Sequence, residues 1–259
     1  MELVDTHCHL QFARLKGRIK PVLADAQAAG VKRLICVGTT LEDSAQAVEI
    51  AGAHLNVWAS IGVHPHDVKT FSQVKIGQFK KLLDRPKVVA LGEVGLDYYR
   101  LYSPKDQQLA ALRAQIEASL GSGLPFIFHV RQAFPDFWRL FDSYPNLGGV
   151  VHSFSAGPAE LDQILSRGLY VGLNGIVTFS QSPSQLAAAK ALPADRLVLE
   201  TDAPFLAPAP YRGVVCQPKY IRDIAEFLAE LRSEKLEQLA AATTNNAVKL
   251  FGLGEAPGE

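Results

Sequence analysis

Short runs of β-branched and apolar residues alternate along the chain with longer stretches whose apolar residues recur at helical spacing. Such runs predict buried strands, and the longer stretches predict amphipathic helices. We expect strands at Leu3–Thr6, Arg33–Gly38, Val57–Gly62, Val88–Gly92, Phe126–His129, Gly149–His152, Tyr170–Leu173 and Leu197–Glu200. We expect helices at Ile19–Ala29, Leu41–Ala53, Lys75–Leu83, Pro104–Leu120, Ala133–Phe141, Pro158–Leu165, Pro183–Ala191 and Gln217–Leu231.

Strands and helices follow one another at a spacing of roughly 30 residues, as in successive βαβ units of an α/β fold. The chain has 259 residues, and a TIM-type barrel has about 250. The pattern therefore predicts a (β/α)8 barrel, with a doubly wound open sheet as its competitor. No linker or low-complexity segment interrupts the chain, so residues 1–259 are expected to form a single domain. A final helix at Glu234–Phe251 is expected outside the barrel, and residues 254–259 are expected to form a flexible tail.

The composition excludes several classes of protein. Hydrophobic residues make up 48% of the chain and charged residues 20%, so the chain buries a substantial core and is not intrinsically disordered. Lys plus Arg and Asp plus Glu each number 26, which leaves no overall positive field for long nucleic acids or acidic membranes. A nucleic-acid substrate would therefore have to be held locally.

The lack of a recognisable targeting signal and the small number of cysteines favour a location in the cytoplasm. The amino-terminal residues lack the basic segment and the apolar stretch of a signal peptide, and no run is apolar enough to predict a membrane span. The three cysteines, Cys8, Cys36 and Cys216, are too few and too scattered for a disulfide framework. We therefore expect a reducing compartment and no membrane partner.

Candidate chemistry gathers at the carboxyl ends of the predicted strands. Of the 7 histidines, most lie at or just beyond those ends, and two carboxylates join them. In a barrel these ends open onto one face, where active sites form. The residues are His7, His9, His64, Glu93, His129, His152 and Asp202.

His7 and His9 flank Cys8 in an extended segment. Alternation along such a segment points both imidazoles one way and the thiol the other way, so that one metal ion can bind both rings. The preceding Asp5 offers the carboxylate that metal-bound imidazoles usually need as a partner. Two histidines that serve only packing or the surface are the alternative for an isolated pair at this spacing.

Glu93 follows the fourth predicted strand, between Gly92 and Gly95. A carboxylate can bridge two cations as a neutral imidazole cannot, so Glu93 is the candidate shared ligand of a binuclear site. The flanking glycines permit close approach of the backbone to a ligand. The alternative is a buried ion pair between Glu93 and Arg100 or Arg131.

The later strand ends supply the remaining candidates. His129 and His152 would complete a second metal site, although either one alone would be an ordinary core histidine. Asp202 closes the eighth strand, where a carboxylate can act as metal ligand and general base, or else cap a turn. Arg131 could donate charge-assisted hydrogen bonds to a phosphate oxygen. The alternative is that it is an ordinary surface arginine. Asp97 is expected to orient its neighbours.

Taken together, these segments resemble the TatD family of metal-dependent hydrolases, within the amidohydrolase-like barrels. The matching stretches span nearly the whole chain and lie at Val4–His9, Gly62–Pro65, Gly92–Tyr99, Gln107–Gln108, Leu124–Arg131, Val151–Phe154 and Leu199–Pro204. The resemblance implies one to three divalent cations, and we expect two, as Zn²⁺, Mg²⁺, Mn²⁺ or Ni²⁺. The ligands that it implies are His7, His9, Glu93, His129, His152 and Asp202.

The resemblance also implies an activity, the metal-dependent hydrolysis of phosphodiesters, often as a 3′-to-5′ exonuclease on DNA. A water activated by the cations would attack phosphorus, and Asp202 would accept its proton. We expect Arg131, His64 and Arg212 to contact the substrate. Aromatic residues near the mouth are candidates for stacking a terminal base, with a role in packing as the alternative for each: Tyr98, Tyr99, Phe154 and Phe205. The expected substrate is a DNA 3′ end or a short oligonucleotide.

One departure from the family pattern lies in the last loop. Family members commonly carry Asn-Glu-Pro shortly after an Arg-Gly pair, whereas this chain has Cys216, Gln217 and Pro218 after Arg212 and Gly213. A neutral side chain replaces an acid there, so we expect the orientation of the substrate to differ.

Two other functions remain open. The same barrel and metals can activate water for attack on a carbonyl group, so a hydrolase of cyclic amides, lactones or esters is the enzyme alternative. Similar barrels often use a carboxylated lysine as the bridging ligand, and the fourth and fifth strands end without a lysine. This absence favours Glu93 and phosphorus chemistry. The second alternative is a non-catalytic metal-binding barrel, against which the complete set of ligands argues.

Overall fold

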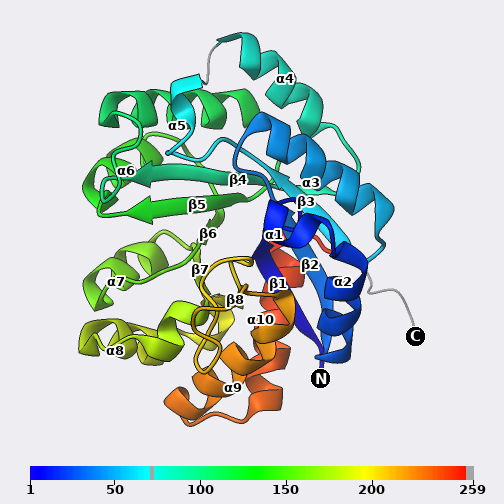
Figure 1. The fold of residues 1–259 in the computed structure, drawn as a ribbon. Helices are drawn as coiled ribbons and strands as arrows, with labels where there is room; N and C mark the ends of the chain where they lie inside the picture. The colour runs from blue at the N-terminus through cyan, green and yellow to red at the C-terminus, as the bar shows by residue number, and fades with distance from the viewer. Residues whose placement is uncertain (71–72, 255–259) are drawn as a thin grey trace.

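The structure, a computed structural model, describes residues 1–70 and 73–254. Eight strands form one parallel sheet in chain order, and helical connections join successive strands (Figure 1). The strands are β1 (Leu3–Cys8), β2 (Val31–Val37), β3 (Val57–Ile61), β4 (Val88–Asp97), β5 (Phe126–Arg131), β6 (Gly149–Val151), β7 (Tyr170–Leu173) and β8 (Leu197–Leu199).

The sheet closes on itself where the segment after β8 meets the end of β1. Cys8 and Ala203 form a parallel bridge. The amide of Asp202 donates to the carbonyl of His7 at 2.8 Å, and the amide of His9 donates to the carbonyl of Ala203 at 2.7 Å. The predicted (β/α)8 barrel is therefore confirmed, and the open doubly wound sheet is excluded.

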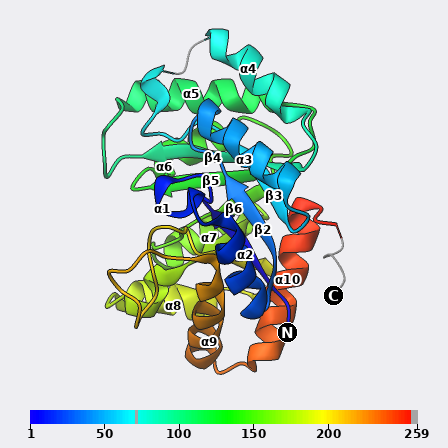
Figure 2. The same ribbon diagram turned by 45° about the vertical axis from the view of Figure 1, so that its right-hand side comes forward.

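Helices surround the barrel, as two views of the ribbon show (Figures 1 and 2). The α-helices are α1 (Ala13–Lys16), α2 (Ile19–Ala28), α3 (Leu41–Ala53), α4 (Gln73–Leu83), α5 (Lys105–Ser119), α6 (Phe134–Phe141), α7 (Pro158–Ser166), α8 (Pro183–Ala191), α9 (Ile221–Arg232) and α10 (Leu236–Phe251). Short 3-10 helices lie at η1 (Val68–Thr70), η2 (Gly175–Phe179), η3 (Ala194–Arg196) and η4 (Pro218–Tyr220). The sequence pattern does not predict α1, because four residues carry no helical period. Within the described residues, no helix is long and apolar enough to cross a membrane.

Each strand turns alternate side chains toward the barrel interior and toward the helices. In β2, Ile35 and Val37 belong to one buried cluster, and Leu34 and Cys36 belong to the larger cluster that includes the helices. This division follows from the two-residue period of a strand. The near-continuous apolar runs of the sequence are therefore buried on both faces.

Helix α10 covers the amino end of the barrel. The hydroxyl of Thr244 donates to the carbonyl of Glu2 at 2.9 Å, and the side-chain amide of Asn246 donates to the carbonyl of Leu197 at 2.8 Å. Phe251 joins the interior cluster of the barrel. The helix therefore lies outside the barrel, as expected, and its apolar face seals the end opposite the face where such barrels form active sites. Of the predicted tail, residues 255–259 lie outside the described residues.

Strand β4 continues to Asp97 instead of ending at Gly92, so Glu93 lies within the strand. A Cβ atom at Gly95 would lie 1.9 Å from the carbonyl oxygen of His129 on β5, and a Cβ atom at Gly92 would also meet the β5 backbone. These glycines therefore let β4 and β5 approach each other. The expectation that they admit a ligand is wrong.

Candidate active site

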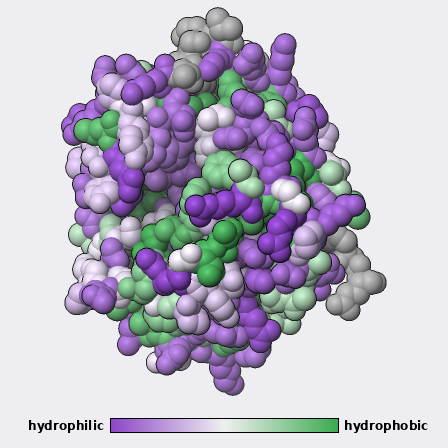
Figure 3. Space-filling view, viewed as in Figure 1, coloured by the Kyte–Doolittle hydropathy of each residue, from purple (hydrophilic) through white to green (hydrophobic). Residues whose placement is uncertain are grey.

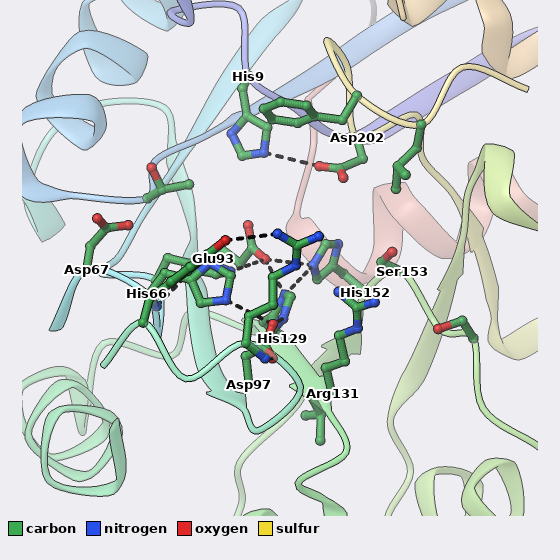
Figure 4. A pocket seen from close by; sticks show the side chains of 18 of the residues that line it. His9, His66, Asp67, Glu93, Asp97, His129, Arg131, His152, Ser153 and Asp202 are labelled. Atoms are coloured by element: carbon green, nitrogen blue, oxygen red, sulfur yellow. Dashed lines mark hydrogen bonds and ion pairs between the residues drawn. The ribbon is translucent and has the colours of Figure 1, made fainter. Parts of the chain in front are cut away.

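A cavity of about 540 Å³ opens at the carboxyl ends of the strands. In the space-filling view, one face of the molecule is hollowed near its middle (Figure 3). His7 is buried below the cavity, and Arg212 does not line it. The other predicted site residues line it: His9, His64, Glu93, His129, Arg131, His152 and Asp202. All of these except His64 are labelled in Figure 4, which shows them around the cavity.

Glu93 lies at the floor of the cavity, and its two carboxylate oxygens face different histidines. Oε1 lies 2.7 Å from Nδ1 of His129, 2.8 Å from Nε2 of His152 and 3.3 Å from Nε2 of His64. Oε2 lies 3.3 Å from Nε2 of His7. In the described part of the chain, Glu93 forms no ion pair with an arginine. The alternative of a buried arginine pair is therefore wrong.

Opposing effects set the charge of this cluster. Burial alone would raise the pKa of Glu93, but the charges of His152 and His64 and hydrogen bonds from His129 and His152 hold it well below its usual range. Burial would lower the pKa of His152, but Glu93 and Glu200 raise it well above its usual range. Glu93 is thus ionised at neutral pH, which is the state that binds a cation.

His7, His9 and Asp202 form a second cluster beside Glu93. The Nε2 atoms of His7 and His9 lie 3.2 Å apart. Oδ1 of Asp202 lies 3.2 Å from Nε2 of His9 and 3.7 Å from Nε2 of His7. Cys8 turns away from both rings, and its thiol donates to the carbonyl of Ile35 at 3.4 Å. The predicted alternation of this segment is confirmed.

The donor atoms in these clusters fit divalent cations. Three sets of three residues place one donor each within 4.8 Å of one another: His7 with Glu93 and His152, His7 with His9 and Asp202, and His64 with Glu93 and His129. Imidazole nitrogen and carboxylate oxygen are the ligands that Zn²⁺ and its first-row neighbours bind. His7 and Glu93 each occur in two sets. Only the carboxylate of Glu93 has two oxygens that neighbouring cations could share, whereas Nε2 of His7 can bind one cation.

Hydrogen bonds behind the rings decide which nitrogen faces the cavity. Nδ1–H of His9 donates to the carbonyl of Val37 at 2.8 Å, which leaves Nε2 free for a cation. Nε2–H of His129 donates to Asp97 at 3.1 Å, which turns Nδ1 toward Glu93 and the cavity. Partners of this kind orient metal-binding imidazoles. Asp97 therefore orients a neighbour, as expected.

Asp5 has a different role from the one expected. It accepts hydrogen bonds from the amide and the hydroxyl of Thr201, at 3.0 and 2.6 Å, and from the amide of His7 at 3.2 Å. Burial raises the pKa of Asp5 to about 8 despite these bonds. The expectation that Asp5 holds a metal-binding imidazole is wrong, because its side chain turns toward the end of β8. It joins β1 to the segment that carries Asp202.

Two residues that shape the site were not singled out by the sequence pattern. Nε2 of His66 lies in the cavity, 3.0 Å from Oδ2 of Asp97. Glu200 lies behind His152, with Oε1 at 3.5 Å from Nδ1. Each stands two residues from a predicted site residue, and that spacing places side chains on one side of an extended segment. The spacing is the signal that would have found them.

Helix α5 holds two cavity loops through buried glutamines. The side chain of Gln108 accepts from the amide of Asp97 at 2.8 Å and donates to its carbonyl at 3.0 Å. Gln115 makes the same pair of bonds to Val63, at 2.7 and 3.2 Å. The two glutamines are seven residues apart, so they share one face of the helix.

The three predicted substrate contacts lie in different places. His64 is buried among the metal-binding candidates. Arg131 lines the cavity, with its guanidinium carbon 3.9 Å from the ring centre of Tyr99. Arg212 lines a neighbouring depression, with its guanidinium carbon 3.5 Å from the ring centre of Phe179. The structure therefore brings His64 and Arg131, but not Arg212, to the proposed ligands.

The departure from the family pattern lies behind the cavity. Cys216 is buried, and its amide donates to the carbonyl of Pro204 at 3.1 Å. Gln217 precedes η4 and does not line the cavity. An effect of Gln217 on the substrate would therefore act through the loop.

Known proteins are similar to this chain over nearly its whole length. The family model described as TatD related DNase matches residues 4–252. An uncharacterised metal-dependent hydrolase of Escherichia coli, YcfH, is 37% identical over 97% of this chain and 96% of its own. The 3′-5′ ssDNA/RNA exonuclease TatD of Edwardsiella piscicida is 37% identical over 97% of this chain and 100% of its own. The crystal structure of YjjV, a TatD homologue from Escherichia coli, superposes with a TM-score of 0.92 at 29% identity, covering 97% of this chain and 98% of that one. The chain therefore belongs to the TatD family of metal-dependent hydrolases.

Proposed function

We propose that this protein is a divalent-metal-dependent phosphodiesterase that removes nucleotides from the 3′ ends of DNA strands or short oligonucleotides. The exonuclease among its relatives supports this class of substrate. Two cations, as Zn²⁺, Mg²⁺, Mn²⁺ or Ni²⁺, would be held by His7, His9, Glu93, His129, His152 and Asp202. The three cysteines are free and buried, which suits a reducing compartment, and we place the enzyme in the cytoplasm.

One observation carries this proposal. Glu93 turns its two oxygens to two sets of imidazoles on the floor of a cavity whose wall holds Arg131. A phosphodiester is charged before, during and after hydrolysis, whereas a lactone or cyclic amide is neutral when it binds. A guanidinium on the wall of a cavity that can hold two cations therefore favours phosphorus over carbon as the reacting atom.

Divalent cations bound at this centre supply Lewis-acid activation of a water molecule and of the phosphoryl group. The chain itself supplies the base and the anchor for the substrate. Burial alone would raise the pKa of Asp202, but His9 and His7 lower it, so the carboxylate is ionised and accepts the proton of the attacking water. Arg131 lies over Tyr99, which leaves guanidinium N–H groups free to donate to a phosphoryl oxygen.

The bonding changes follow from this placement. The water oxygen forms a bond to phosphorus, and the bond between phosphorus and the upstream 3′-oxygen breaks. That oxygen takes up a proton from solvent, Asp202 releases to solvent the proton that it accepted from the water, and the terminal nucleotide leaves with a 5′-phosphate. Nε2 of His64, 3.3 Å from Oε1 of Glu93, lies close enough to the centre to donate to a phosphoryl oxygen.

The test uses metal-stripped protein, a 5′-labelled single-stranded oligonucleotide and added Mg²⁺, Mn²⁺ or Zn²⁺. We expect a ladder of products shortened from the 3′ end. Asp202→Asn should lower the rate by about 10²- to 10⁴-fold, because it removes the proton acceptor. Asp142→Asn is the matched control, since Asp142 is an exposed carboxylate paired with Arg167, and it should keep the full rate.

Other outcomes would overturn the proposal. If the oligonucleotide stays intact while lactones or cyclic amides are hydrolysed, the substrate is a carbonyl compound. Shortening from the 5′ end would exclude the polarity proposed here. An Asp202→Asn variant as fast as the Asp142→Asn control would remove Asp202 from the mechanism.

A further inference from the structure

The two sides of the central cavity differ in chemistry. In a closed barrel of eight strands in chain order, β8 and β1 lie opposite β4 and β5. Phe12 and Phe205 follow β1 and β8, whereas Arg100 and Arg131 stand after β4 and at the end of β5, and all of them line the cavity. Figure 4 shows Asp202 on one side of the centre and Arg131 on the other. The metal-binding candidates thus lie between an aromatic side and a cationic side.

Phe205 presents an aromatic ring to solvent at the rim of the cavity. Its side chain is 45% exposed, and its ring meets the ring of Phe12 edge to face, with centres 5.9 Å apart. In the space-filling view, hydrophobic side chains gather over the loop between β8 and α9, beside the hollow (Figure 3). An exposed ring backed by a second ring is typical of a surface on which a base stacks.

The loop that carries Phe205 is held from several directions. The amide of Phe205 donates to the carbonyl of Asp202 at 2.9 Å, and the amide of Cys216 donates to the carbonyl of Pro204 at 3.1 Å. The carbonyl oxygen of Leu206 lies against Gly175, where an added Cβ would be 2.0 Å away. The ring therefore stays exposed because its backbone is fixed, which lowers the entropy cost of stacking a ligand on it.

Beyond Phe205 lies a second depression, of about 320 Å³. It shares Phe205 and Leu206 with the central cavity, and it carries Arg14 and Arg212. Both arginines are exposed. Among residues 1–70 and 73–254, neither guanidinium forms an ion pair with a carboxylate. A path with two unpaired positive charges therefore leads out of the metal centre across an aromatic ring.

We propose that this depression is a second phosphate subsite, which holds the strand upstream of the bond that is cleaved. The upstream base stacks on Phe205, and the next phosphate is held by Arg212 and Arg14. This inference rests on the proposed nuclease function and adds to it the path of the strand. The formal net charge of the chain is +0, so the attraction for nucleic acid is concentrated at such local arginines.

The proposal predicts a preference for unpaired ends. A base inside a duplex is stacked on both faces and paired, so reaching Phe205 requires that it first be unpaired and unstacked. A single strand offers a free face to the ring at no such cost. The subsite therefore selects single-stranded ends, and it selects oligonucleotides with more than one phosphodiester over dinucleotides.

The experiment compares a dinucleotide, which has one phosphodiester, with a single-stranded decanucleotide. For the metal-loaded enzyme, Arg212→Ala and Arg14→Ala should each lower the ratio of the two kcat/KM values, decanucleotide to dinucleotide, by about tenfold. The slope of log kcat/KM against log salt should become less negative by about 0.7 for each arginine removed. Arg113→Ala is the matched control, because Arg113 lies in α5 and lines neither depression.

Variants of Phe205 test the stacking step. Phe205→Ala should lower kcat/KM for the decanucleotide by about tenfold, which is within the range for loss of one base–aromatic stack. Phe205→Trp should keep the activity, and Phe205→Leu, which is apolar without a ring face, should not. Equal activity of the Leu and Trp variants would show that the ring face is not used, and would overturn the stacking step.

Failure of this inference can be told from failure of the proposed function. If Arg212→Ala lowers kcat/KM equally for both substrates, or for neither, the second subsite is overturned while the nuclease function stands. If the wild-type enzyme cleaves neither substrate, the nuclease function fails. In that case, fluorescence anisotropy with a labelled decanucleotide decides the subsite, because loss of binding in Arg212→Ala but not in Arg113→Ala supports it and equal binding overturns it.

Discussion

At the scale of single residues, the site depends on which nitrogen each imidazole turns to the cavity. His9 is fixed by the carbonyl of Val37, and His129 by the carboxylate of Asp97. Among the described residues, no group hydrogen-bonds to the buried Nδ1 of His7. Neighbouring carboxylates and packing alone therefore orient the ring of His7.

Asp97 provides the first prediction at this scale. Asp97→Asn keeps the size of the side chain but weakens the bond to Nε2–H of His129, so the ring loses orientation and basicity. We expect the cation concentration for half-maximal activity to rise about 10- to 100-fold, because outer partners of metal-binding histidines have effects of this size. The measurement is a titration of metal-stripped protein with Mn²⁺ or Zn²⁺, followed by activity and by calorimetry.

Asp136→Asn is the control for this titration. Asp136 accepts a hydrogen bond from the hydroxyl of Tyr98 at 2.9 Å, and it belongs to none of the three sets of candidate ligands found among the described residues. An unchanged half-saturating concentration in both variants would contradict the orienting role of Asp97. A loss of maximal rate in Asp97→Asn that excess cation does not restore would also contradict it.

Sequence patterns locate the site residues because a parallel barrel brings all carboxyl strand ends to one face. His7, Glu93 and Asp202 are far apart in the chain, yet their positions relative to the strands suffice to predict that they meet. The partner of Asp5 could not be predicted in this way. Thr201 is 196 residues away, and no local pattern tells whether a buried carboxylate turns to a ring or to a backbone amide.

At the scale of elements, the pairing of β4 with β5 sets the position of Glu93. Gly95→Ala would place a methyl group 1.9 Å from the carbonyl oxygen of His129. Neither β4 nor β5 can move apart to relieve this clash without displacing a candidate ligand. We expect a loss of stability of about 3 kcal/mol or more, together with weaker cation binding. Urea unfolding followed by circular dichroism measures the first effect.

A second glycine in the same chain is the matched control. Gly77 is exposed in the middle of α4, and a Cβ there would meet nothing within 4 Å. Gly77→Ala should therefore stabilise the protein by about 0.5–1 kcal/mol, because alanine loses less backbone entropy in a helix. Equal unfolding midpoints for the two variants would show that the close approach of β4 and β5 does not matter.

The boundaries of elements are where the sequence pattern is least informative. The run of apolar residues predicts that the fourth strand ends at Gly92, and glycine generally weakens a strand. In the structure, β4 continues through Gly92 and Gly95 because the neighbouring backbone of β5 needs the space. That need lies on another strand and has no signal within β4 itself.

At the scale of the whole molecule, the barrel has one end for stability and one for function. Helix α10 closes the amino end with apolar residues such as Ala247 and Phe251. The carboxyl end instead buries a dense group of imidazoles and carboxylates, which contributes little packing and places like charges close together. A cation that binds this group takes the place of the protons on the imidazoles and binds only the folded state, so it should stabilise the entire fold.

Removal of metal tests this coupling. A ligand that binds only the folded state stabilises it by about 2.7 kcal/mol at a hundred times its Kd. For a domain of this size, that free energy corresponds to a rise in Tm of about 5–10 °C. We expect chelation with EDTA to lower the Tm by this amount, and readdition of Zn²⁺ or Mn²⁺ to restore it, as measured by calorimetry.

The source of the shift can be assigned with one variant. Glu93→Gln removes the oxygen charge that two sets of histidines share, so its Tm should respond to added cation by less than half the shift of the wild type. Asp142→Asn, which alters only an exposed ion pair, should keep the full response. If the Tm of Glu93→Gln rises as much as that of the wild type, the cation that stabilises the fold does not depend on Glu93, and the shared ligand must be sought elsewhere in the cavity.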